Sequence, residues 1–124
     1  MPILRAEDAP SFALPNLSVT GLAAPSRGSR ETSVWRITLS PGSPGVAHSL
    51  DREEIFVVLA GSATVTLGDE RSELRAGDVL VVPPGQLFAF GNAGPGALDA
   101  LAMAPVGIRA KMPDGEFFAP PWTE

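Results

Sequence analysis

The chain has 124 residues, with 9 basic and 14 acidic side chains and no cysteine. One domain is expected at this length, and the lack of cysteine excludes disulfides, thiolate metal sites and thiol nucleophiles. The net charge of -5 argues against a nucleic-acid partner, because phosphate binding relies on clustered lysine and arginine side chains.

The start of the chain bears on where the protein works. Its first ten residues contain Glu7 and Asp8 and lack the apolar run of a secretory signal. The longest apolar stretch, residues 55–60, is too short to span a bilayer. We therefore expect a cytoplasmic protein without a membrane partner.

Residues 1–30 are rich in proline and glycine and show no helical period. They predict a loosely ordered N-terminal arm with short extended pieces at 11–14 and 17–22. Such an arm either folds over its own barrel or is exchanged between two subunits, and both alternatives fit a homodimer, which we expect.

From residue 32 onward the sequence predicts short strands that alternate with turns. The hydrophobic content of 44% excludes disorder, and no window of helical length shows a clean 3.6 period. Segments 53–60 and 63–67, on either side of Gly61, predict a hairpin. The fold class is therefore all-β, a sandwich or a barrel. The expected strands are 34–39, 53–60, 63–67, 72–75, 79–82, 86–90 and 97–104.

The last twelve residues, 113–124, form an aromatic and proline-rich stretch. Phe117, Phe118 and Trp122 stand among prolines, which predicts an extended tail. Three exposed aromatic side chains would make an adhesive patch, so we expect this tail to pack on its own barrel or on a partner subunit.

Two segments resemble the two signature motifs of the cupin family. Residues 42–61 match the first motif, G-x5-H-x-H-x3-E-x6-G, except that Leu50 stands at the second histidine position. Residues 77–92 match the second motif, G-x5-P-x-G-x2-H-x3-N, except that Phe88 stands at the histidine position. The resemblance implies an antiparallel double-stranded β-helix, the jelly-roll barrel, over residues 31–112, often dimeric and with a ligand cavity in its mouth.

The family resemblance also implies a metal site, of which only part is present. Three histidines and one glutamate bind a divalent metal in that family, and only His48 and Glu54 remain here. A transition metal held by imidazole and carboxylate groups normally needs at least three protein ligands, so we expect no cofactor or weak metal binding. The alternative is a divalent transition metal with Gln86 as a replacement ligand, since alternation places Gln86 on the same strand face as Phe88.

The apolar residues Leu50 and Phe88 at two metal-ligand positions predict an apolar pocket in place of a metal site. Phe56 and Phe90 are expected mainly to fill the barrel, and Phe88 to form a wall of the pocket. Arg36 is expected to point outward, although an inward arginine would bind a carboxylate. The expected ligand-binding residues are His48, Leu50, Glu54, Phe56, Gln86 and Phe88.

Three functions fit these residues. The first is a degenerate cupin that binds a small, mostly apolar organic molecule, with His48 and Glu54 as a hydrogen-bonded polar anchor. The second is an enzyme, an isomerase, cyclase or dioxygenase-like protein, in which the same two residues bind a metal or act as an acid–base pair without one. The third is a structural or regulatory dimer whose cavity is filled.

Overall fold

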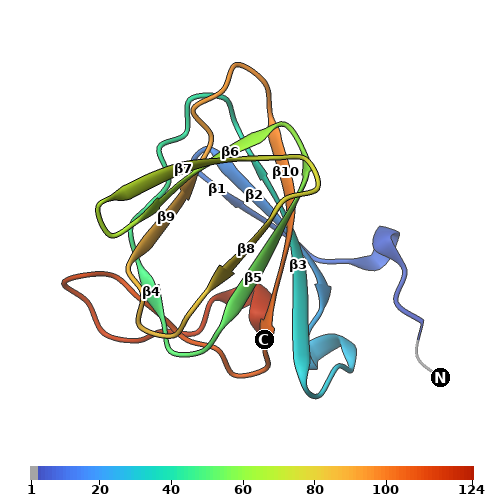
Figure 1. The fold of residues 1–124 in the computed structure, drawn as a ribbon. Helices are drawn as coiled ribbons and strands as arrows, with labels where there is room; N and C mark the ends of the chain where they lie inside the picture. Colours follow the sequence, from blue (N-terminus) through green and yellow to red (C-terminus); the bar gives the residue numbers. More distant parts are fainter. Residues whose placement is uncertain (1–2) are drawn as a thin grey trace.

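The computed structural model describes residues 3–124, which form one barrel of strands that pair antiparallel throughout (Figure 1). The helices in this range are short 3-10 turns, and none of them has the length and hydropathy needed to cross a membrane. The strands are β1 (Ser11–Leu14), β2 (Leu17–Ala23), β3 (Thr32–Leu39), β4 (Ser49–Leu50), β5 (Glu54–Ala60), β6 (Ser62–Leu67), β7 (Glu70–Arg75), β8 (Val79–Val82), β9 (Phe88–Gly91), β10 (Leu98–Pro105) and β11 (Ala110–Lys111). The turns are η1 (Ala6–Asp8), η2 (Pro25–Arg27) and η3 (Pro121–Thr123).

Two sheets face each other across the barrel. The larger has six strands in the order β1-β2-β3-β10-β5-β8, and the smaller has the order β7-β6-β9. A third pair, β11-β4, lies at one end of the barrel. This arrangement confirms the all-β jelly-roll barrel expected from the sequence.

The N-terminal segment belongs to the barrel wall and is not a loosely ordered arm. Strand β2 pairs with β3 along most of its length, and β1 pairs with β2, so both extend the six-stranded sheet. The Val19 side chain of β2 is fully buried in the core. The extended pieces expected at 11–14 and 17–22 correspond to these two strands, with β2 one residue longer.

The hairpin expected around Gly61 is wrong. Strand β5 pairs with β10 and β8, whereas β6 pairs with β7 and β9, so the chain crosses from one sheet to the other at Gly61. Gly61 has a φ of +80°, and a Cβ atom there would lie 2.4 Å from the carbonyl oxygen of Ala97. The local hairpin is instead β6–β7, which turns at Gly68 and Asp69.

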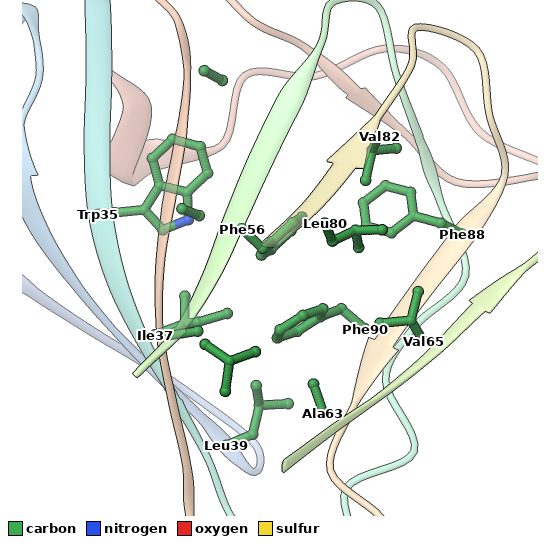
Figure 2. Packing of buried hydrophobic residues seen from close by; sticks show 14 of the residues in the cluster. Trp35, Ile37, Leu39, Phe56, Ala63, Val65, Leu80, Val82, Phe88 and Phe90 are labelled. Atoms are coloured by element: carbon green, nitrogen blue, oxygen red, sulfur yellow. The ribbon is translucent and has the colours of Figure 1, made fainter. Parts of the chain in front are cut away.

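The core lies between the two sheets, and alternation explains which side chains enter it. In β3 the buried residues alternate with outward ones, and Figure 2 shows Trp35, Ile37 and Leu39 on the inner side of this strand, facing Phe56 and Phe90. In β5 the buried positions begin at Glu54 and continue through Phe56. The alternation that buries Phe56 in β5 therefore also places the carboxyl group of Glu54 inside the barrel.

The C-terminal tail folds back over the barrel of its own chain. Backbone hydrogen bonds of 2.8 Å join Ala110 and Phe118 in both directions. Ser33 Oγ donates a hydrogen bond of 3.1 Å to the carbonyl oxygen of Thr123, and the Trp122 ring packs edge-on against Phe12. In Figure 1 the tail crosses the lower end of the barrel. The exchange of segments between subunits remains a prediction.

Candidate functional site

A cavity of about 530 Å³ lies inside the barrel. Residues of the C-terminal tail form part of its wall. Its wall combines the inner side of β3 with residues from β5 and β9, the β1–β2 turn, the loop before β4 and the tail. Val46 and Leu14 line it and are also exposed, so they stand at its rim. The apolar side chains of the wall include Trp35, Ile37, Leu39, Phe56, Phe90, Phe118 and Trp122.

Phe56 and Phe90 form a stacked aromatic pair in the cavity wall. Their rings are stacked with centroids 4.5 Å apart and an interplanar angle of 16°, and both line the cavity. Phe88, which was expected to form the wall, does not line the cavity and is only 1% exposed. It packs behind the wall, with its ring 5.9 Å from that of Phe56. The roles expected for Phe88 and Phe90 are thus reversed.

His48 is held by its neighbours in one orientation and one tautomer. Its backbone exchanges hydrogen bonds of 3.0 and 2.9 Å with Phe88, and its Nδ1 lies 2.7 Å from the carbonyl oxygen of Val46. A carbonyl only accepts, so Nδ1 carries the proton and Nε2 keeps its lone pair. Burial lowers the pKa of His48, so the imidazole is neutral near pH 7.

Glu54 places a carboxyl group in the cavity wall without a partner. It is 5% exposed, and the structure gives it no hydrogen bond or ion pair within residues 3–124. Desolvation raises the pKa of Glu54 to about 8, so the group is mostly protonated at pH 7 and can donate as well as accept. The expected hydrogen bond between His48 and Glu54 is not formed, because His48 turns to Val46 instead.

Of the expected ligand-binding residues Leu50 and Gln86, only Leu50 lies in the cavity wall. Leu50 is buried and lines the cavity, as expected. Gln86 is not part of the wall, and the expectation that it shares a strand face with Phe88 is wrong. Strand β9 begins only at Phe88, so alternation does not reach back to Gln86, whose Nε2 donates to the carbonyl oxygen of Leu87.

The residues present do not fit the metal site of the family. The positions of its four ligands hold His48, Leu50, Glu54 and Phe88, and two of these side chains have no lone pair to offer. Within residues 3–124 there is no group of three or more His, Cys, Asp or Glu side chains that could hold a metal ion. Gln86, the expected replacement ligand, lies outside the cavity wall.

The cavity wall, as formed by the described part of the chain, contains no lysine or arginine. Arg36 points outward, as expected, and forms an ion pair with Asp99 across β3 and β10. Among residues 3–124, Glu54 and His48 are thus the only ionisable side chains in the wall, and both are neutral near pH 7.

Sequence reasoning missed much of the wall. Trp35, Ile37 and Leu39 alternate along β3, so their shared face was visible in the sequence, but nothing marked it as facing a cavity. The β1–β2 turn and Trp122 enter the wall only because the two ends of the chain meet there. No local pattern carries that information.

Comparison with known proteins agrees with this architecture. Residues 35–103 match the family model described as "Cupin domain". Auxin-binding protein 5 of Zea mays is 40% identical over 53 residues, which are 43% of this chain and 34% of that protein. Auxin-binding protein 1 of Arabidopsis thaliana is 37% identical over 73 residues, 56% of this chain and 37% of that protein. The matches therefore span little more than a third of these relatives.

Solved structures share the fold at low sequence identity. The polyketide cyclase RemF from Streptomyces resistomycificus has a TM-score of 0.80 and 18% identity, with 96% of this chain and 87% of that chain covered. KdgF from Halomonas sp. has a TM-score of 0.71 and 19% identity, with 85% and 94% covered. The family match extends over more than half of the chain, and the barrel, its motifs and its neighbours agree with it: the protein belongs to the cupin domain family.

Proposed function

We propose that the protein binds a small, flat, mostly apolar organic molecule that carries a neutral hydrogen-bonding group. One observation carries the proposal: the cavity of about 530 Å³ has an apolar wall interrupted by two ionisable side chains, His48 and Glu54. Its volume lies within the range of about 300–1,000 Å³ typical of small-molecule sites. The stacked Phe56 and Phe90 pair lines the cavity and offers an aromatic contact to an aromatic ligand.

The two ionisable side chains define what the ligand carries. His48 Nε2 accepts a hydrogen bond, and the protonated Glu54 carboxyl group donates one. A phenolic hydroxyl or a ketone therefore finds a partner on the wall. A carboxylate ligand is disfavoured, because no lysine or arginine in the wall would pair with a buried negative charge.

Some of the related proteins have names that point to a small organic ligand. Two relatives are named auxin-binding proteins, and a structural neighbour is named a polyketide cyclase. The alternative of a structural barrel with a filled cavity receives no support, because the space between the sheets is not closed by Leu50, Phe56 and Phe90.

Calorimetric titration with three matched probes tests the proposal. Naphthalene, 2-naphthol and 2-naphthoate share one ring system and differ in having no polar group, a hydroxyl or a carboxylate. We expect 2-naphthol to bind about tenfold more tightly than naphthalene, since one hydrogen bond contributes roughly 1.4 kcal/mol, and 2-naphthoate to bind most weakly. Lack of binding by all three probes would refute the proposal.

A rim variant locates the probe. Val46 is 62% exposed at the rim, so Val46→Trp should obstruct entry without disturbing the core. Leu87→Trp is the matched control, because Leu87 is 43% exposed and outside the wall. Binding of 2-naphthol should weaken in the first variant and stay unchanged in the second. Equal binding by both variants would place the probe elsewhere.

An acid–base enzyme is the second candidate, favoured by the free Nε2 lone pair of His48 in the same wall as a protonated Glu54. Such a pair would remove a proton from carbon beside a carbonyl and donate one to its oxygen. Deuterium exchange at the α-carbon of 2-tetralone in D2O, followed by NMR, tests it. His48→Gln should reduce the exchange to the rate in buffer, and equal rates with and without wild-type protein would exclude this candidate for that probe.

A further inference from the structure

Four large apolar side chains line the cavity and are also exposed to solvent. Leu14 ends β1, Val46 lies in the loop before β4, and Met112 and Phe118 belong to the C-terminal tail. Their exposed fractions lie between 38% and 62%. A side chain that borders both the cavity and the solvent marks the place where the cavity opens. We call these four residues the rim.

Backbone groups hold most of the rim in place. Ala110 and Phe118 exchange two backbone hydrogen bonds, which close the loop that carries Met112. The carbonyl group of Val46 accepts a hydrogen bond from His48 Nδ1. Three of the four rim residues are therefore positioned by contacts within the chain, without a ligand.

Glu54 lies on the inner side of the cavity, away from the rim. It begins β5, and strands β2, β3 and β10 separate β5 from β1, the strand that ends at Leu14. At about 4.8 Å per strand, the four spacings place β5 roughly 19 Å from β1 along the curved sheet. Glu54 is also buried, whereas the rim is exposed. The cavity therefore has a polar inner end and an apolar open end.

The cavity is larger than a two-ring molecule requires. An apolar cavity of about 150 Å³ binds one benzene ring, and this cavity measures about 530 Å³. A bicyclic ligand that bonds to Glu54 therefore leaves space between its rings and the rim. The rim side chains remain in contact with water unless something covers them, which is unfavourable. A molecule long enough to fill the remaining space also covers the rim.

We propose that the ligand carries an unbranched apolar chain opposite its hydroxyl group, and that this chain leaves the cavity between Val46, Met112 and Phe118. The inference rests on the proposed function and adds a chemical class, the alkyl-substituted aromatic alcohols. A hydroxyl group bonded to Glu54 turns the opposite edge of the ring system toward the rim. Each CH2 group that the rim covers should raise the affinity about two- to fourfold. The rim residues thus determine specificity for the chain.

Calorimetric titration with two isomers tests the proposal. 6-Butyl-2-naphthol carries its chain opposite the hydroxyl group, and 3-butyl-2-naphthol carries the same chain beside it, so their hydrophobicity is matched. We expect the first to bind at least about tenfold more tightly than 2-naphthol, and the second no more tightly than 2-naphthol. Equal affinities of the two isomers, with 2-naphthol bound, would overturn this inference alone. Failure of 2-naphthol and both isomers to bind would overturn the proposed function as well.

A rim variant identifies the residues that hold the chain. In Val46→Ser with Met112→Ser, the affinity gain of 6-butyl-2-naphthol over 2-naphthol should fall below about twofold. The matched control is Leu59→Ser with Leu87→Ser, two exposed leucines outside the wall, which should keep the full gain. A full gain in the rim variant would overturn the proposal. If the ligand-free wild type also bound phosphatidylcholine vesicles through the rim, a lipid surface would replace the chain as its occupant.

Affinity labelling keeps the proposal testable should the rim variant fail to fold. The chain has no cysteine, so a single introduced cysteine reports on its own position. The probe is 2-naphthol with a butyl chain at position 6 that ends in a chloroacetamide, from which a thiolate displaces chloride to form a thioether. By mass spectrometry, Met112→Cys should be labelled at least about tenfold faster than Leu87→Cys, and excess 2-naphthol should remove the difference. Equal labelling rates would overturn the proposal.

Discussion

The ring of Phe88 lies 4.4 Å, centroid to centroid, from the ring of His48. In the cupin family a histidine at the position of Phe88 would share a metal with His48, whereas here the two rings pack against each other. The substitution therefore converts a coordination contact into an aromatic one, and the wall behind the cavity is closed by packing.

We predict that metal binding returns when both missing donors are restored. The variant Leu50→His with Phe88→His should bind nickel or zinc near one equivalent by elemental analysis, and its melting temperature should rise on metal addition. The wild type should show neither effect. His48→Ala in the restored variant is the control and should remove the rise. A stoichiometric metal in the wild type would contradict this prediction.

The pKa of Glu54 predicts how stability depends on pH. The folded chain raises this pKa from its ordinary value of 4.5 to about 8, so between these values the unfolded state binds fewer protons than the folded state. The stability linked to protonated Glu54 is complete below pH 4.5 and is lost as the pH rises to about 8, on the order of 5 kcal/mol at most.

Glu54→Gln removes this titration, so its stability relative to the wild type should increase from pH 4.5 to 8. Urea unfolding at several pH values measures the difference. The lowered pKa of His48 affects both proteins alike and cancels in the comparison. Parallel pH profiles for the two proteins would show that Glu54 does not titrate as described.

Gly61 and Gly77 form a matched pair for testing the crossing between sheets. Both have positive φ angles, +80° and +95°, but a Cβ atom at Gly61 would collide with the Ala97 carbonyl, whereas nothing lies within 4 Å of one at Gly77. Gly77→Ala should cost about 1 kcal/mol, for backbone strain alone. Gly61→Ala should cost several times more in the free energy of unfolding by urea. Similar losses would show that the crossing tolerates a side chain.

The tail should contribute to binding through Trp122 and not through Phe117. Trp122 lines the cavity and packs against Phe12, whereas Phe117 is 50% exposed and outside the wall. Trp122→Ala should weaken 2-naphthol binding at least tenfold, because it removes part of the wall. Phe117→Ala should leave the affinity unchanged. An unchanged affinity in Trp122→Ala would show that Trp122 does not contribute to the binding site.

The sequence predicted the barrel well because its turns and alternation are local signals. The strands expected at 34–39, 79–82 and 97–104 are β3, β8 and β10 with small changes at their ends. The second motif ends at Asn92, whose Nδ2 donates to the carbonyl oxygens of Leu39 and Gly96, so its role in the fold is to join distant loops. The wrong hairpin at Gly61 arose because sequence adjacency does not reveal which sheet a strand enters.

The site was predicted only in part. The positions of His48, Leu50 and Glu54 followed from the motif spacing, and all three line the cavity. Whether Gln86 lies in the wall depends on where β9 begins. The proline-rich turn before β9 prevented the start of the strand from being predicted from the sequence. The partner of His48 also depended on a backbone carbonyl, which no side-chain pattern encodes.

The cavity wall joins segments from the two ends of the chain, residues 14–19 and 118–123. Under the proposed function, a molecule bound between them would contact both, so separating either segment from the barrel would also lose the binding energy. In a chain without cysteine, the ligand would then act as a reversible cross-link that closes a loop of about a hundred residues. Occupancy of the barrel would accordingly protect both ends from proteases at once.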